Sequence, residues 1–173
     1  NGYAQGAFNV NAVCQVKAAV DVHQILRSPA IIQGADLANG FMGGRTDFAN
    51  STLEDKKAGA KNIGAAVKKY AADSDIPVAL HLDHGKNFDS CIAAIEGGYT
   101  SVMIDGSSLP FDENVELTRE VVKYAHERGV SVEGELGVLA GVEDHVFAAT
   151  STYTNPLSAI DFFKKTGVDA LAI

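Results

Sequence analysis

The residues with the clearest chemical potential are residues 81–85, with the sequence His-Leu-Asp-His-Gly. They follow a short apolar run, residues 77–80, which is typical of a buried parallel strand. Titratable groups are costly in a protein core unless they are paired or bound to a metal. A neutral imidazole beside a carboxylate suits a metal ligand next to a general acid or base. We therefore interpret the end of this strand as part of a reactive site.

Side chains alternate along a strand, so Leu82 and His84 are predicted to share one face and Asp83 to lie on the other. If the alternation breaks at the strand end, Asp83 and His84 both reach one cleft. The structural alternative is a hydrogen-bonded core histidine, with Asp83 as the cap of the following helix. The combination of two histidines, one aspartate and a glycine at a strand end favours the functional interpretation.

Carboxylates also lie at the ends of the next two predicted strands, at Asp105 and Glu135. Together with His84 they offer one imidazole and two carboxylates, which suits zinc, or a harder divalent ion if oxygen ligands dominate. Asp105 has an equally plausible structural use, because it can accept hydrogen bonds from the backbone N–H groups of the turn that follows. Asp83 and the loop residue Glu143 are then the candidates for proton transfer, although a loop carboxylate is solvated by default.

Predicted strands and helices alternate along the whole chain. The strands are expected at residues 6–10, 30–33, 77–84, 101–106, 130–136 and 168–173, and the helices at 12–26, 51–72, 88–96, 113–128 and 156–166. Asn11 is expected to cap the first helix, and Ser51 with Glu54 to form a capping box for the second. Residues 34–50 are expected to be a loop, because they are rich in Gly, Asn and Asp. Residues 137–155, which contain the acidic pair Glu143 and Asp144, are expected to be a second loop.

This alternation of apolar strands with helices predicts an α/β fold with a parallel sheet. The polar residues fall at the carboxyl ends of the strands, where such sheets build their sites. No GxGxxG motif follows the first strand, which weakens a dinucleotide-binding assignment. A closed barrel needs eight strands and six are counted. We therefore predict a (β/α)8 TIM barrel of which about six β/α units are present, as a single domain over residues 1–173.

Composition sets the broad class. The 173 residues are 46% hydrophobic with a formal net charge of -8, which indicates a folded domain and argues against nucleic acid as a partner. No apolar run approaches the roughly 20 residues of a membrane span. Two distant cysteines make no disulfide framework, so a reducing, cytoplasmic location is expected. The first residue is Asn1 and the last, Ile173, lies in an apolar run, so we expect a piece of a longer protein.

Five segments then match something specific. In order they are residues 6–11 (GAFNVN), 81–85 (HLDHG), 101–107 (SVMIDGS), 110–114 (PFDEN) and 132–137 (VEGELG). Together they resemble the class II, zinc-dependent fructose-bisphosphate aldolases and the related tagatose-bisphosphate aldolases. The resemblance implies a dimeric or tetrameric (β/α)8 barrel of glycolysis and gluconeogenesis. It also implies reversible cleavage of a sugar bisphosphate to the triose phosphates dihydroxyacetone phosphate and glyceraldehyde 3-phosphate.

The resemblance also implies individual roles. His84 matches the first ligand of the catalytic zinc, and Asp83 matches the acid that serves the C4 hydroxyl. Asp105 and Glu135 match ligands of a second or alternate metal position, which takes another divalent ion or a monovalent cation. Glu143 matches the glutamate that moves protons at C3 of dihydroxyacetone phosphate.

Asn9 matches a substrate-contacting asparagine of the family.

The sequence departs from the family pattern in three ways. The family's two other zinc histidines and its glycine-rich phosphate loops are expected beyond Ile173, and the family's leading helix is missing. Ala35 stands where the family often has a serine near phosphate.

Three alternatives remain open at this point. The substrate is either fructose or tagatose bisphosphate, which differ only at C4. A non-catalytic, aldolase-like partner subunit is disfavoured, because it would need none of the five candidate site residues, which are Asp83, His84, Asp105, Glu135 and Glu143. A zinc hydrolase on the same barrel would use metal-bound hydroxide as its nucleophile.

Overall fold

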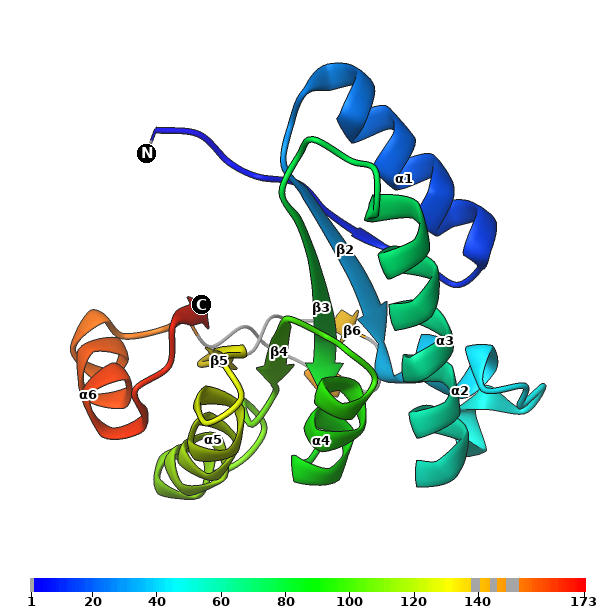
Figure 1. Cartoon of the computed structure of the whole chain (residues 1–173). Helices are drawn as coiled ribbons and strands as arrows, with labels where there is room; N and C mark the ends of the chain where they lie inside the picture. Colours follow the sequence, from blue (N-terminus) through cyan, green and yellow to red (C-terminus); the bar gives the residue numbers. More distant parts are fainter. Residues whose placement is uncertain (1, 138–140, 144–145, 149–152) are drawn as a thin grey trace.

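The computed structural model describes residues 2–137, 141–143, 146–148 and 153–173, with side chains described for 2–137 and 153–173. Strands and helices alternate along the chain (Figure 1). The strands of the main sheet are β1 (Ala7–Asn9), β2 (Ala30–Ala35), β3 (Val78–Gly85), β4 (Ser101–Ile104), β5 (Ser131–Glu135) and β8 (Ala170–Ala172). The helices are α1 (Val13–Leu26), α2 (Asp36–Met42), α3 (Leu53–Ala71), α4 (Phe88–Glu96), α5 (Phe111–His126) and α6 (Pro156–Thr166), with the 3-10 turn η1 (Phe48–Asn50).

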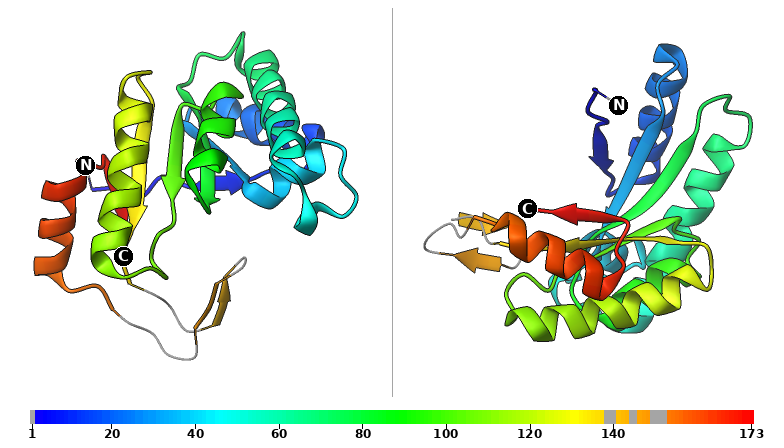
Figure 2. Two further views of the ribbon diagram at one scale, coloured as in Figure 1. Left: turned by 90° about the horizontal axis from the view of Figure 1, so that it is seen from below. Right: turned by 90° about the vertical axis from the view of Figure 1, so that its left-hand side faces the viewer.

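The six strands form one sheet in the order β1-β2-β3-β4-β5-β8, and every neighbouring pair is parallel. The sheet curls, and the helices cover its outer side (Figures 1 and 2). The predicted α/β class and the partial (β/α) barrel are therefore confirmed. Since all strands run the same way, their carboxyl ends meet at one rim. Among the described residues, none of the helices combines the length and apolar character that a bilayer crossing requires.

The hydrophobic core lies between the outer face of the sheet and the helices. Leu82, Val102 and Val132 are register neighbours on β3, β4 and β5, and all three are fully buried. Helix residues such as Val16, Ile63 and Phe162 belong to the same buried cluster. Because strand side chains alternate with period two, the residues between these apolar ones face the inner side of the curved sheet.

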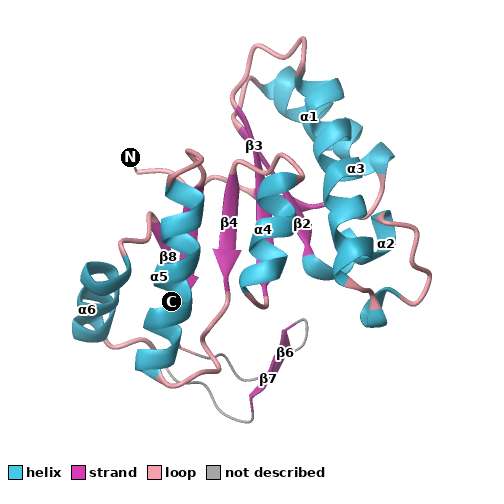
Figure 3. Ribbon diagram, turned by 60° about the horizontal axis from the view of Figure 1, so that its bottom comes forward, coloured by secondary structure: helices cyan, strands magenta, loops and turns pink. Residues whose placement is uncertain are grey.

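The predicted loop at residues 34–50 is wrong in part, because it contains α2 and η1. Helix α2 packs unusually close to α3: a Cβ at Gly59 would lie 1.7 Å from the Asn39 carbonyl oxygen, and one at Gly43 would lie 2.0 Å from the Asp55 carbonyl oxygen. The glycines that indicate a loop in isolation therefore permit a tight helix–helix contact. The predicted loop at 137–155 contains a short hairpin, β6 (Gly141–Glu143) and β7 (Val146–Ala148), apart from the main sheet (Figure 3).

Two predicted helix caps are also corrected. The capping box of α3 is made by Thr52 and Asp55, one residue later than predicted, with each side chain accepting from the other's backbone N–H. Helix α1 starts after Ala12 without a side-chain cap. The backbone N–H of Asn11 donates to Gln15 Oε1 instead, so this helix start is stabilised by a residue inside the first turn.

Tyr99 packs against Gly34 near the end of β2 and hydrogen-bonds to α2. Its hydroxyl donates a 2.8 Å hydrogen bond to Asn39 Oδ1, and both residues are buried. A Cβ at Gly34 would lie 2.2 Å from that hydroxyl oxygen. The missing side chain at Gly34 therefore leaves the space in which the Tyr99 hydroxyl reaches Asn39.

A second buried polar contact fixes α2. Asp36, in the first turn of α2, is 4% exposed and forms an ion pair with Lys56 of α3. The other carboxylate oxygen, Oδ1, is buried without a hydrogen-bond partner among the described residues. A buried carboxylate retains its charge only at a large desolvation cost, so Lys56 is needed to offset it.

We expect Lys56→Met to destabilise the protein by about 3 kcal/mol, because it leaves the Asp36 carboxylate buried without its cation. The free energy of unfolding from urea denaturation measures this. The matched control is Lys17→Met, which breaks the exposed ion pair with Asp21 on α1 and should change stability little. Equal effects of the two substitutions would contradict a special role for the buried pair.

Candidate active site

The end of β3 departs from regular strand geometry at His84. Its φ is +48°, in the left-handed region, and the pairing of β3 with β4 shifts between Leu82 and Gly85. Regular alternation would place His84 on the outer face with Leu82. The irregularity turns its imidazole to the inner side, where it meets Asp105 and Glu135. The predicted break in alternation is thus confirmed as a register shift between β3 and β4. Both side chains reach the inner side, but Asp83 turns toward β1 and His84 toward β4 and β5.

His84, Asp105 and Glu135 form a compact cluster at the carboxyl rim. His84 Nδ1 lies 3.2 Å from Asp105 Oδ2 and 3.8 Å from Glu135 Oε2. One ligand atom from each residue lies within 4.8 Å of the other two, and all three side chains are partly buried. The structure therefore brings together the three residues that the sequence predicts as metal ligands.

The hydrogen bond to Asp105 raises the pKa of His84 to about 9, helped by the charges of Asp83 and Glu135 and opposed by burial. Burial alone would raise the pKa of Asp105, but hydrogen bonds from His84 and Ser107 hold it below its usual range. Asp105 Oδ1 accepts from the backbone N–H and the hydroxyl of Ser107. The turn-stabilising use of Asp105 and its contact with His84 therefore coexist, one on each carboxylate oxygen.

The cluster fits a divalent metal ion by its donor set. One imidazole nitrogen and two carboxylate oxygens suit zinc, and they also suit harder divalent ions. A metal-bound imidazole is neutral on its ligand nitrogen, so an ion bound there would replace the proton shared between His84 and Asp105.

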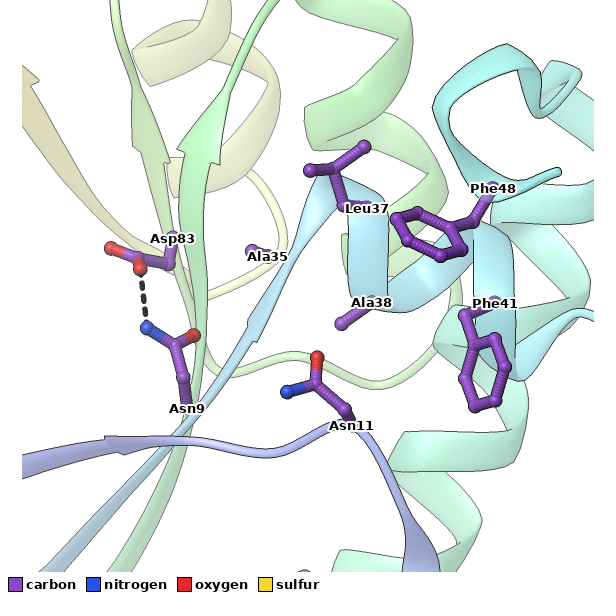
Figure 4. A pocket seen from close by; sticks show the side chains of 8 residues that line it. All are labelled: Asn9, Asn11, Ala35, Leu37, Ala38, Phe41, Phe48 and Asp83. Atoms are coloured by element: carbon purple, nitrogen blue, oxygen red, sulfur yellow. Dashed lines mark hydrogen bonds between the residues drawn. The ribbon is translucent and has the colours of Figure 1, made fainter. Parts of the chain in front are cut away.

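Asp83 points the other way along the rim, toward β1. Asn9 Nδ2 donates a 2.8 Å hydrogen bond to Asp83 Oδ2 (Figure 4). Asp83 does not cap the following helix, because the N-cap of α4 is Asn87, whose side chain accepts from Ser90 N–H. The structure thus places Asp83 and Asn9 together and leaves the Asp83 carboxylate available at the rim.

A second histidine–carboxylate pair lies below the cluster, and sequence reasoning assigned it no function. His81 Nδ1 hydrogen-bonds Ser101 Oγ at 2.8 Å, and its Nε2 lies 3.4 Å from Glu133 Oε2. Burial lowers the pKa of His81 and raises that of Glu133. Strand periodicity could have indicated that Glu133 faces the site, because it stands two residues before Glu135 on β5 and side chains two apart share a face.

A cavity of about 480 Å³ opens beside Asp83, over the ends of β1 and β2. Figure 4 shows Asp83 and Asn9 on one side of it and two aromatic rings on the other. Its lining residues are Asn9, Asn11, Ala35, Leu37, Ala38, Phe41, Phe48 and Asp83. The aromatic wall was not predicted, because residues 34–50 read as a loop and carry no pattern that points to a pocket.

Glu143 is the last residue of β6, and its side chain lies outside the described residues. Its predicted role in proton transfer therefore stays a prediction.

The family model described as fructose-bisphosphate aldolase class-II matches residues 1–173. The chain belongs to the class-II fructose-bisphosphate aldolase family. Among curated members, it is 49% identical to the fructose-bisphosphate aldolase of Treponema pallidum over 99% of this chain and 49% of that protein. It is 42% identical to the fructose-bisphosphate aldolase of Geobacillus stearothermophilus over 98% of this chain and 55% of that protein. The chain thus spans about half the length of these relatives.

Solved aldolase structures share the fold. The YdjI aldolase from Escherichia coli K12 is 30% identical, with a TM-score of 0.73 over 98% of this chain and 53% of that one. A putative fructose-1,6-biphosphate aldolase from Coccidioides immitis is 27% identical, with a TM-score of 0.77 over 98% of this chain and 54% of that one. Because the chain belongs to the class-II family, metal binding is the expected chemistry of the His84–Asp105–Glu135 cluster.

In metal-free protein, we expect Asp105→Asn to lower the pKa of His84 from about 9 toward its ordinary value, because the charged hydrogen-bond acceptor is lost. NMR titration of the imidazole measures it. The raised pKa stabilises the fold below about pH 6.5, and this contribution disappears as the pH rises through 9, so the variant should lose that slope in stability.

The matched control is Glu133→Gln, which removes a carboxylate from the same inner face of the sheet. Glu133 has His81 as its histidine partner, at 3.4 Å, so its loss should move the His84 pKa less. An unchanged pKa near 9 in Asp105→Asn would mean that other groups hold the proton on His84.

Proposed function

We propose that the complete protein containing this chain is a zinc-dependent class-II aldolase that reversibly cleaves fructose 1,6-bisphosphate. The observation that carries the proposal is the His84–Asp105–Glu135 cluster, which lies beside Asp83 at the carboxyl rim of a family barrel. The match of the family model along the whole chain supports the same reaction class. The products would be dihydroxyacetone phosphate and glyceraldehyde 3-phosphate.

His84 would hold the catalytic zinc ion, with Asp105 and Glu135 serving the same ion or a second divalent or monovalent cation nearby. When bound, such an ion supplies Lewis-acid stabilisation of the negative charge that develops on substrate oxygen. His84 and Glu135 lie on β3 and β5, and Asp105 directly follows β4, so the packed sheet holds their relative positions.

Asp83 would act at the C4 hydroxyl of the sugar. In the cleavage direction its carboxylate takes the hydroxyl proton, the C3–C4 bond breaks, and C4 becomes the aldehyde carbon. The bonding electrons remain on C3, which then takes a proton from Glu143. Asn9 would orient Asp83 through the 2.8 Å hydrogen bond and contact the substrate with its remaining amide groups. The condensation reverses these steps, with Asp83 as the acid.

A cytoplasmic homodimer or homotetramer follows from the family resemblance as part of the proposal. Tagatose 1,6-bisphosphate is the alternative substrate, since it differs from fructose 1,6-bisphosphate only in the configuration at C4. A non-catalytic partner subunit is the alternative. It is disfavoured because such a subunit would not need the left-handed backbone conformation that brings His84 to Asp105 and Glu135.

We expect the complete protein to cleave fructose 1,6-bisphosphate in an assay coupled to triose phosphate reduction. Activity should disappear with a chelator and return with Zn²⁺, because the metal stabilises the charge of the transition state. Tagatose 1,6-bisphosphate, run in parallel, decides which C4 configuration is preferred. A fully metal-loaded protein that cleaves neither sugar would support the partner-subunit alternative.

We expect Asp83→Ala to retain metal and to lose turnover by roughly 10²-fold or more, the usual contribution of a positioned acid–base group. His84→Ala is the comparison, and it should lose metal and activity together, because a zinc site tolerates little loss of ligands. Metal content by elemental analysis and kcat together separate the two roles. Unchanged turnover in Asp83→Ala, or full zinc occupancy in His84→Ala, would contradict the corresponding assignment.

A further inference from the structure

One imidazole on the inner face of the sheet meets side chains of two other strands. His81 Nδ1 lies 2.8 Å from Ser101 Oγ on β4, and His81 Nε2 lies 3.4 Å from Glu133 Oε2 on β5. Because β4 lies between β3 and β5 in the sheet, the contact with Glu133 reaches across a whole strand. We refer to His81, Ser101 and Glu133 together as the His81 bracket.

The strands that the His81 bracket joins are the same three that position the candidate metal ligands. On β3, His81 stands three residues before His84, and on β5, Glu133 stands two residues before Glu135. The serine of the bracket begins β4, the strand that leads directly to Asp105. The bracket therefore lies one layer of side chains deeper than the metal cluster, on the same face of the sheet.

The protonation state of His81 suits contacts with both partners at once. Burial lowers the pKa of its imidazole, which favours the neutral form with one donor and one acceptor nitrogen. In that form the Ser101 hydroxyl donates to Nδ1, and the Nε2–H group faces the Glu133 carboxylate. The side chain of His81 is buried, so water has little access to either nitrogen. A ring without nitrogen atoms at this position would remove both contacts.

Backbone pairing alone does not fix the spacing of the cluster. The register of β3 with β4 shifts between Leu82 and Gly85, around the residue that supplies the imidazole. The 3.8 Å separation of His84 Nδ1 and Glu135 Oε2 therefore depends on side-chain contacts between the strands as well as on the ladder. The His81 bracket supplies such contacts immediately before the shift.

We propose that His81 and Glu133 are positioning residues for the metal site. By joining β3 to β5 they hold His84 and Glu135 at the spacing that a bound ion requires, and they act without binding the ion or the substrate. The inference rests on the proposed aldolase function, because it takes the cluster to hold zinc. Groups that orient metal ligands from outside commonly change metal affinity by roughly 10- to 100-fold.

The test measures the zinc affinity of the complete protein by competition with a chromophoric chelator, with folding of each variant checked by circular dichroism. We expect His81→Phe, which keeps an aromatic ring but no nitrogen, to weaken zinc binding roughly tenfold or more. Glu133→Leu removes the acceptor on β5 and should also weaken it. The double variant should bind zinc about as tightly as His81→Phe alone, because both substitutions break the same contact.

A second substitution at residue 133 separates position from charge. Glu133→Gln keeps an oxygen that can accept from His81, so its zinc affinity should remain within roughly threefold of wild type, since the hydrogen bond is retained. The absorption spectrum of Co²⁺ in place of zinc reports the geometry of the ligands, and it should change in His81→Phe but not in Glu133→Gln. The matched control is Ser131→Ala, an exposed residue that begins β5, which should change neither measurement.

The outcomes separate the inference from the function on which it rests. Zinc binding and a Co²⁺ spectrum like those of wild type in folded His81→Phe would overturn the inference. Equal weakening by Glu133→Gln and Glu133→Leu would also overturn it, because the charge of residue 133 would then be what matters. If His81→Phe does not fold, the two Glu133 variants decide. A complete wild-type protein that binds no zinc would instead overturn the proposed function itself.

Discussion

The geometry of the rim depends on the backbone of His84. A residue with a Cβ at φ +48° carries strain, of order 1–3 kcal/mol, that the surrounding structure must hold in place. Leu82 is fully buried and Gly85 pairs with Ile104, so the chain is fixed on both sides of the strained residue. With regular alternation, the imidazole would point into the apolar core and Asp105 and Glu135 would lack their partner. The backbone conformation of His84 thus brings its imidazole to the inner face beside Asp105 and Glu135, whereas Asp83 reaches that face by regular alternation.

The two ends of the rim differ in electrostatic character. Around His84 the groups are charged and hydrogen-bonded to each other, whereas around α2 the charges are turned away and the inner surface is apolar. The Asp36–Lys56 pair contributes to this division because it keeps one carboxylate and one ammonium behind the helix that lines the cavity. Desolvating both groups is costly, so the pair is better understood as fixing the place of α2 than as a source of stability.

Most of the fold followed from local patterns, because its strands are apolar runs that end in polar residues. The ligand cluster was predictable for the same reason: His84, Asp105 and Glu135 each stand at such an end. Helix α2 was not predictable, since Gly40 inside it is a poor helix former and the helix depends on close contact with α3 at Gly43 and Gly59. The capping box was displaced by one residue because Ser51 with Glu54 and Thr52 with Asp55 have the same spacing. The pairing of His81 with Glu133 required strand register, which the sequence alone does not provide.

The contact beneath the end of β2 constrains how this sequence can change over time. Any side chain at Gly34 would collide with the Tyr99 hydroxyl, and loss of that hydroxyl would leave the buried Asn39 amide without its donor. The side chains allowed at residues 34 and 99 are therefore coupled through this contact. A lineage that enlarges residue 34 must also shorten residue 99 or replace Asn39, so substitutions here are expected to occur in compensated sets. Residue 34 is next to Ala35, which lines the cavity. The limit on residue 34 therefore also limits how the backbone at this edge of the cavity can change.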